Sequence, residues 1–132
     1  MTLGEWLNPR LEAAPTELAA AIRELLREAQ GRGGDDGEAD GDASTIPGRL
    51  GAAALWGLDA VSRGDHAVEQ RSPRGTALRL LAADAALTYA FEAAADLGGD
   101  VVGLAVRLGP RGALGARLAS AGGPEARGGE VR

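Results

Sequence analysis

A row of polar side chains at four-residue spacing runs through the most apolar stretch of the sequence, and it consists of Asp84, Thr88, Glu92 and Asp96. Residues four apart lie on one side of an α-helix and drift by about 40° per step. Two carboxylates on one helix face have the chemistry for an acid–base pair or a metal site. Carboxylate metal sites in helical bundles add Glu-x-x-His motifs from facing helices, whereas this sequence has a single histidine. We therefore interpret the row mainly as a solvated seam that pairs with arginines of a neighbouring helix.

Asp84 is the member of this row that we expect to be partly buried, because its nearest neighbours along the helix are apolar. The arginines expected to lie against it are Arg49, Arg63 and Arg107. An alternative polar site combines Asp84, Thr88 and Glu92 with His66, which lies between carboxylates in a predicted loop. Such a site would make the protein a small ligand-binding or weakly hydrolytic one. No G-x-S-x-G, Walker or G-x-G-x-x-G pattern accompanies these residues.

Residues 36–42, DGEADGD, match the opening of a calcium-binding loop, in which acidic side chains alternate with other residues around a glycine. The ligands in this interpretation are Asp36, Glu38, Asp40 and Asp42. The twelfth position, where such loops need a bidentate glutamate, is Pro47. Calcium binding is therefore the least favoured of the functional interpretations, and we expect no cofactor.

Composition and charge narrow the range of partners. The 132 residues have a net charge of −5, and all 14 basic residues are arginines. Residues 31–46 carry a net −4 (five acids, one arginine) and residues 101–132 a net +3 (five arginines, two glutamates), so there is no dense basic face for nucleic acid. The absence of cysteine excludes disulfides and thiol chemistry. Without a signal peptide or an uncharged apolar run of about 18 residues, we expect a cytoplasmic protein with no membrane partner.

Apolar residues spaced by three and four predict an all-α protein, a compact bundle of four to five helices. We expect helices over residues 15–30, 47–63 and 76–97, a short helix over 101–109 and a last helix that opens at Pro110. Residues 1–14 are predicted to form a lead-in of one or two helical turns, with Pro9 unsuited to a helix interior. A single domain would then span residues 1–121, with a flexible acidic loop over 31–47 and a disordered tail over 122–132.

The stretch 76–97 has two apolar faces, which the acidic row divides. One face includes Leu80, Leu87 and Phe91, and the other includes Leu78 and Tyr89. A helix with two apolar faces packs on both sides, so we expect this helix in the middle of the bundle.

Trp56 lies about 100° away from the apolar stripe of its own predicted helix. We expect it to contribute to a partner-binding surface, together with Ala52, Ala60 and Tyr89. With the two apolar faces of residues 76–97, this surface predicts a non-enzymatic protein-interaction or self-association module. The expected partner is another protein or a second copy in a homo-oligomer.

Overall fold

All regular structure in the described part of the chain is α-helical. The computed structural model describes residues 1–32, 45–63 and 72–121. The helices are α1 (Leu3–Ala13), α2 (Thr16–Arg32), α3 (Ile46–Arg63), α4 (Pro73–Asp96), α5 (Val101–Leu108) and α6 (Ala113–Ala121). The predicted all-α bundle is therefore confirmed, and residues 101–109, whose valines also favour a strand, form the predicted short helix.

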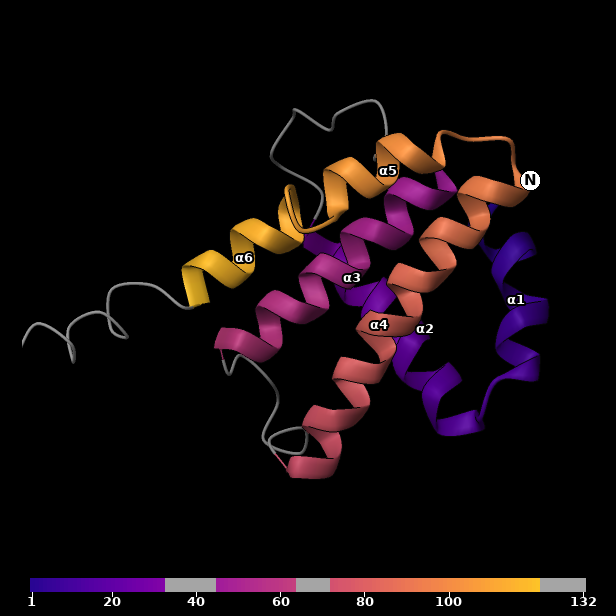
Figure 1. The fold of residues 1–132 in the computed structure, drawn as a ribbon. Coiled ribbons are helices and arrows are strands. Elements are labelled where there is room, and N and C mark those ends of the chain that lie inside the picture. The colour runs from indigo at the N-terminus through magenta and orange to yellow at the C-terminus, as the bar shows by residue number, and fades with distance from the viewer. Residues whose placement is uncertain (33–44, 64–71, 122–132) are drawn as a thin grey trace, which may run out of the picture.

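α4 is the central helix, as its two apolar faces predict. It packs against α2, α3 and α5, while α1 lies on α2, and α6 contacts both α3 and α5. Figure 1 shows α1 on one side of the α3–α4 pair, and α5 with α6 on the other. α2, α3 and α4 thus form the closely packed centre of the bundle, with α1 on one side and the short helices α5 and α6 on the other.

Small residues make the centre close-packed. The buried residues of α4 other than Arg79 are all alanines: Ala82, Ala83, Ala86, Ala90, Ala93 and Ala94. Gly57 of α3 is similarly confined, since an added Cβ would lie 2.9 Å from Leu25 Cδ1 and 3.1 Å from Ala83 Cβ. These six alanines form a stripe along the buried side of α4, which we call the alanine stripe. The prediction that Leu80 lies on a buried face is wrong, because Leu80 lies outside this stripe and is exposed. Short side chains let the three helices approach, and the larger leucines are displaced outward.

The N-terminal segment forms a longer helix than predicted. The Thr2 side chain accepts a hydrogen bond from the Glu5 backbone, and the Glu5 carboxylate accepts one from the Thr2 backbone, which completes a capping box. The hydrogen bond from the Thr2 backbone N–H also lowers the pKa of Glu5. The apolar side of α1 is buried in the core and comprises Leu3, Trp6, Leu7 and Leu11. Pro9 lies inside α1 despite its missing N–H, on the exposed side of the helix, where burial of the opposite side offsets its cost.

Several helix ends differ from the predicted ones. Ser72, rather than Thr76, caps α4: its hydroxyl accepts a hydrogen bond from the Gly75 backbone at 3.0 Å, and Pro73 takes the first helical position. α2 continues to Arg32 and α3 begins at Ile46, so both helices extend into the predicted 31–47 loop. The remaining part of that loop and the predicted tail over 122–132 lie outside the described residues.

Candidate functional site

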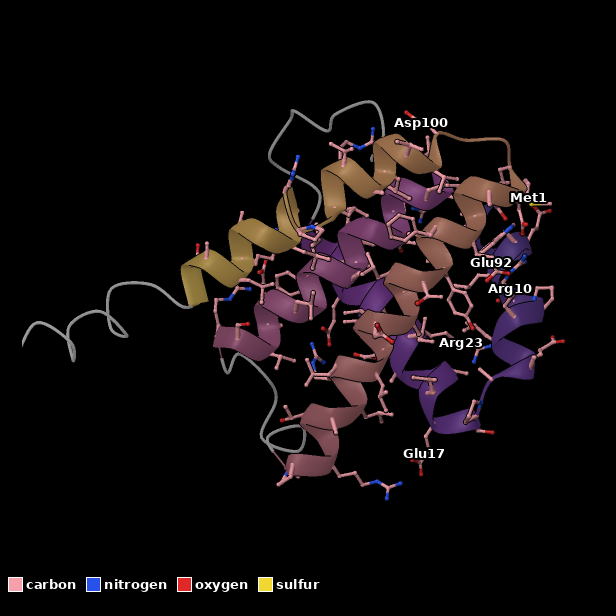
Figure 2. The ribbon with its side chains drawn as sticks, viewed as in Figure 1. Met1, Arg10, Glu17, Arg23, Glu92 and Asp100 are labelled. Atoms are coloured by element: carbon pink, nitrogen blue, oxygen red, sulfur yellow. The ribbon has the colours of Figure 1, made fainter. Side chains whose placement is uncertain are left out.

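The C-terminal half of the acidic row binds an arginine, as predicted. Arg10 of α1 places its Nε 2.9 Å from Glu92 Oε1 and its Nη2 2.6 Å from Asp96 Oδ2. The same guanidinium lies 3.6 Å from the centre of the Trp6 ring and donates to the Trp6 carbonyl. Figure 2 shows Arg10 and Glu92 approaching each other from α1 and α4. These carboxylates therefore fasten α1 to the central helix.

The N-terminal half of the row faces water. Asp84 and Thr88 are exposed, and the Thr88 hydroxyl donates to the Asp84 carbonyl at 3.0 Å. The prediction that Asp84 is partly buried is wrong, because Asp84 lies on the outward side of α4, opposite the alanine stripe. His66 lies outside the described residues, so its predicted partnership with Asp84 stays a prediction. The same holds for the calcium-ligand set of Asp36, Glu38, Asp40 and Asp42.

No metal-binding cluster occurs in the described residues. In residues 1–32, 45–63 and 72–121, no three His, Cys, Asp or Glu side chains gather closely enough to hold an ion. A cavity of about 330 Å³ lies among the N-terminus of α3, the C-terminus of α4 and α5, and Ile46, Leu97 and Leu104 contribute to its lining. A second, more open cavity of about 480 Å³ lies beside Asp59 and Arg117. The predicted polar-site residues Asp84, Thr88 and Glu92 line neither of these two cavities.

The residues predicted to form a partner surface around Trp56 lie in different surroundings. Trp56 is half-buried, with its Nε1 donating to Glu28 Oε2 at 3.4 Å and the Arg63 guanidinium 5.5 Å from its ring centre. Ala60 is buried in the core and Ala52 is exposed. Tyr89 packs against Trp6 of α1, with ring centres 6.3 Å apart and the rings nearly perpendicular. The structure thus directs Trp56 toward α2 and Tyr89 toward α1, and a role in partner binding stays a prediction for all four residues.

An ion pair between a buried arginine and a half-buried glutamate, which the sequence analysis missed, joins α2 to α4. Arg79, 9 % exposed, places Nη2 2.8 Å from Glu28 Oε2 and Nη1 3.3 Å from Glu28 Oε1. The hydrogen bonds from Arg79 hold the pKa of the Glu28 carboxyl below its usual value, against the opposing effect of burial. The sequence did carry a signal for the burial of Arg79. Arg79 precedes Ala82 and Ala83 by three and four residues, a spacing that places it on the same, buried side of α4.

Arg117 forms a third arginine–carboxylate contact between helices. Its Nε and Nη2 lie 2.8 and 3.0 Å from the two carboxylate oxygens of Asp59 on α3. This two-point contact orients α6 against α3. Arg10, Arg79 and Arg117 thus each bind one or two carboxylates of another helix, so these charged groups stabilise contacts between helices.

The outer side of α5 exposes large apolar side chains. Val102 and Val106 are 74 % and 64 % exposed, whereas Leu104 and Leu108 of the same helix are buried. Val101, the first residue of α5, and Leu97, the residue that follows α4, are also exposed. We call the group Leu97, Val101, Val102, Ala105 and Val106 the α5 patch. Val102 and Val106 are each two residues from Leu104, and residues two apart point to nearly opposite sides of an α-helix. This spacing was the sequence signal that the helix is apolar on both sides.

Comparisons of this chain with known protein families, with curated proteins and with solved structures found no match. No helix in the described residues has both the length and the apolarity needed to span a bilayer.

Proposed function

We propose that this protein is a non-enzymatic helical interaction module that associates with another protein molecule, including copies of itself, through the α5 patch. One observation carries the proposal. Of the eight exposed large apolar side chains in the described residues, four lie between Leu97 and Val106. Exposed apolar groups that gather in one place favour burial against a partner, whereas single ones need no explanation.

The polar groups of the described residues support a structural use over a chemical one. Arg10 holds Glu92 and Asp96, Arg79 holds Glu28, and Arg117 holds Asp59, so these carboxylates stabilise contacts between helices. A ligand-binding or hydrolytic site built from Asp84, Thr88, Glu92 and His66 has less support, because Glu92 is bound to Arg10 and Asp84 is exposed on a convex helix face.

The proposal moves the interaction surface from Trp56 to α5. The indole of Trp56 already contacts Glu28 and lies near the Arg63 guanidinium, and Ala60 is inside the core. By contrast, the outer valines of α5 project from a helix whose inner leucines anchor it to the bundle. A partner can therefore cover the α5 patch without unfolding any part of the bundle.

Sedimentation velocity over a concentration series tests the proposal on the isolated chain. Since the patch is smaller than the roughly 800 Å² per partner of stable interfaces, weak association is expected, and the series should reach about 1 mM. The sedimentation coefficient should rise with concentration and the Val102→Asp variant should remain monomeric. Val102 lies in the first turn of α5, where an aspartate is compatible with the helix dipole, so loss of association would not result from loss of α5.

Leu81→Asp is the matched control, because Leu81 is also an exposed apolar residue of a helix but lies on α4, outside the patch. This variant should associate like the unmodified protein. A chain that stays monomeric over the whole series, or one that Leu81→Asp disrupts as strongly as Val102→Asp, would count against the proposal.

A further inference from the structure

We infer that the cavity between the start of α3, the end of α4 and α5 binds a small, uncharged, apolar molecule. This site goes beyond the proposed function and does not depend on it. The cavity lies beside Leu104 on the inner side of α5, whereas Val102 and Val106 of the α5 patch project from the opposite side. Of the patch residues, Leu97 alone also lines the cavity.

The cavity forms where α4 ends and the chain turns into α5. Gly98 has a φ of 71°, and the Gly99 backbone N–H donates to the Ala94 carbonyl at 2.7 Å, so α4 ends here in a tight turn. Figure 1 shows the short α5 next to the beginning of α3 and the end of α4. These three segments border a space of about 330 Å³.

The walls of this space are mainly apolar. They include Ile46, Pro47, Ala94, Leu97 and Leu104. The volume is about twice the roughly 150 Å³ of an apolar cavity that holds benzene, so it admits a molecule of about eight to ten carbon atoms. Apolar walls with a few polar groups at this size are typical of sites for small molecules.

The polar groups around the cavity already have hydrogen-bond partners within the chain. The Thr45 hydroxyl accepts from the Gly48 backbone at 3.1 Å, and the Asp100 carboxylate accepts from the Gly103 backbone at 2.8 Å. Pro47 has no N–H to donate. Water in such a space needs about two to four polar partners. Because these groups are occupied by helix caps, water is held weakly there and an apolar molecule can displace it.

The charged groups of the cavity favour a ligand without charge. Asp100 and Arg107 both contribute to its lining, so their formal charges cancel. Arg107 also takes part in an interaction within the chain. Figure 2 shows Asp100 at the outer end of α5. An anionic ligand would meet Asp100 and a cationic one Arg107, and either would lose hydration against the apolar walls.

Octan-1-ol is a suitable probe, because its chain length matches the volume and it carries no charge. Octanoate and octylammonium have the same chain with an anionic or a cationic head. Each is titrated into the chain labelled at its isoleucine, leucine and valine methyl groups and followed by NMR. With octan-1-ol the methyl signals of Ile46 and Leu104 should shift to saturation, and the midpoint of thermal unfolding should rise with concentration. The two ions should bind at least several-fold more weakly.

Ile46→Thr tests the apolar wall. It keeps a branched side chain but introduces a hydroxyl, and should weaken octan-1-ol binding several-fold. Ile46 is half-buried in the first turn of α3, so the helix should persist. Val102→Thr is the matched control, because it also replaces a methyl group by a hydroxyl but on the outer side of α5, and binding should be unchanged.

Leu97→Trp is a second variant that spares the core. Leu97 lines the cavity and is 46 % exposed, so a larger side chain is tolerated there and should hinder entry of octan-1-ol. Binding should fall several-fold while the midpoint of urea unfolding without ligand changes little. Unaltered binding in both Leu97→Trp and Ile46→Thr would show that the ligand lies elsewhere.

The remaining outcomes are equally decisive. Saturable shifts at Ile46 and Leu104, with a preference for octan-1-ol over both ions, support the site. Shifts that centre on Val102 and Val106, or that grow without saturation, would show adsorption to exposed apolar surface and overturn it. Tighter binding of either ion would overturn the uncharged class of ligand. Val102→Asp separates this site from the proposed function, since that variant should lose self-association yet bind octan-1-ol like the unmodified protein.

Discussion

Arg79 of α4 and Glu28 of α2 form a two-point contact, with nitrogen–oxygen distances of 2.8 and 3.3 Å. Trp56 of α3 donates to the same Glu28 oxygen that receives the shorter of these bonds. A single carboxylate, half-buried near the C-terminal end of α2, therefore connects the three helices. Around it the core consists largely of alanines, whose small side chains bury little area each. The ion pair fixes the orientation of α2 relative to α4, which a core of such small side chains does only weakly.

Loss of the Arg79 side chain should destabilise the protein strongly. Arg79→Ala leaves the Glu28 carboxylate without its main partner in a partly buried position and should lower the free energy of unfolding by about 2–3 kcal/mol. Arg74→Ala is the matched control: Arg74 also pairs with a glutamate of α2, Glu17, but both side chains are exposed, so about 0.5 kcal/mol or less is expected. Urea unfolding measures both. Equal losses for the two variants would show that burial adds nothing to the Arg79 contact.

Acid should weaken the protein partly through Glu28. Its pKa in the folded protein is lowered, first by the hydrogen bonds from Arg79. A lowered pKa contributes stability that is fully present above the unfolded value of about 4.3 and is lost as the pH falls through the folded value. Glu28→Gln should therefore be less stable than the native protein at neutral pH, with the difference shrinking below about pH 4. Thermal unfolding at several pH values measures this difference, and one that is constant with pH would refute the assignment.

α1 should be held mainly by its apolar side chains rather than by Arg10. Trp6 is almost fully buried, so Trp6→Ala should cost about 3–4 kcal/mol. Arg10→Ala removes two partly exposed ion pairs and a stacking contact with Trp6, and about 1 kcal/mol is expected. Hydrogen exchange of the α1 amides provides the readout, with faster exchange in Trp6→Ala than in Arg10→Ala. The reverse order would make the ion pairs the principal attachment of α1.

Two glycines on helices should respond oppositely to replacement by alanine. Gly31→Ala adds a Cβ to open space and should raise the free energy of unfolding by roughly 0.5–1 kcal/mol through helix propensity. Gly57→Ala gains the same propensity but places its Cβ against Leu25 and Ala83, so a net loss of about 1 kcal/mol is expected. Chemical denaturation of both variants measures the difference. A stabilised Gly57→Ala protein would mean that the core has room to expand at this point.

The sequence was sufficient to predict the elements whose signals are local. Ile22 and Leu25 recur at helical spacing, Gly98 ends α4 with a φ of 71°, and Asp100 caps α5, so these helices could be placed in advance. The errors concern residues whose environment depends on distant partners. Arg79 and Asp84 are both charged residues of one helix, yet one is buried because Glu28 lies opposite it and the other is exposed. Pro9 likewise argued against a full helix in the N-terminal segment, because the burial that offsets the cost of a proline inside α1 comes from contacts with other helices.

The surface predicted around Trp56 also depends on contacts with residues that are distant in the sequence. Trp56 was singled out because its position on its own helix left it apart from the apolar stripe, but α2 supplies it with Glu28. The valines of α5 were assigned only to a short helix, and apolar residues of a helix are more often buried than exposed. Only the packing of Leu104 and Leu108 against the bundle determines that Val102 and Val106 must face outward.

The most direct test of the account follows the backbone amide signals of the isotope-labelled protein by NMR while its concentration rises to about 1 mM, the range in which small interfaces associate. The account predicts that the signals shifting with concentration belong to residues 97–107, while the indole signal of Trp56 stays in place. Shifts that centre on Trp56 and Ala52, or an absence of any shift, would contradict the claim that α5 is the interaction surface.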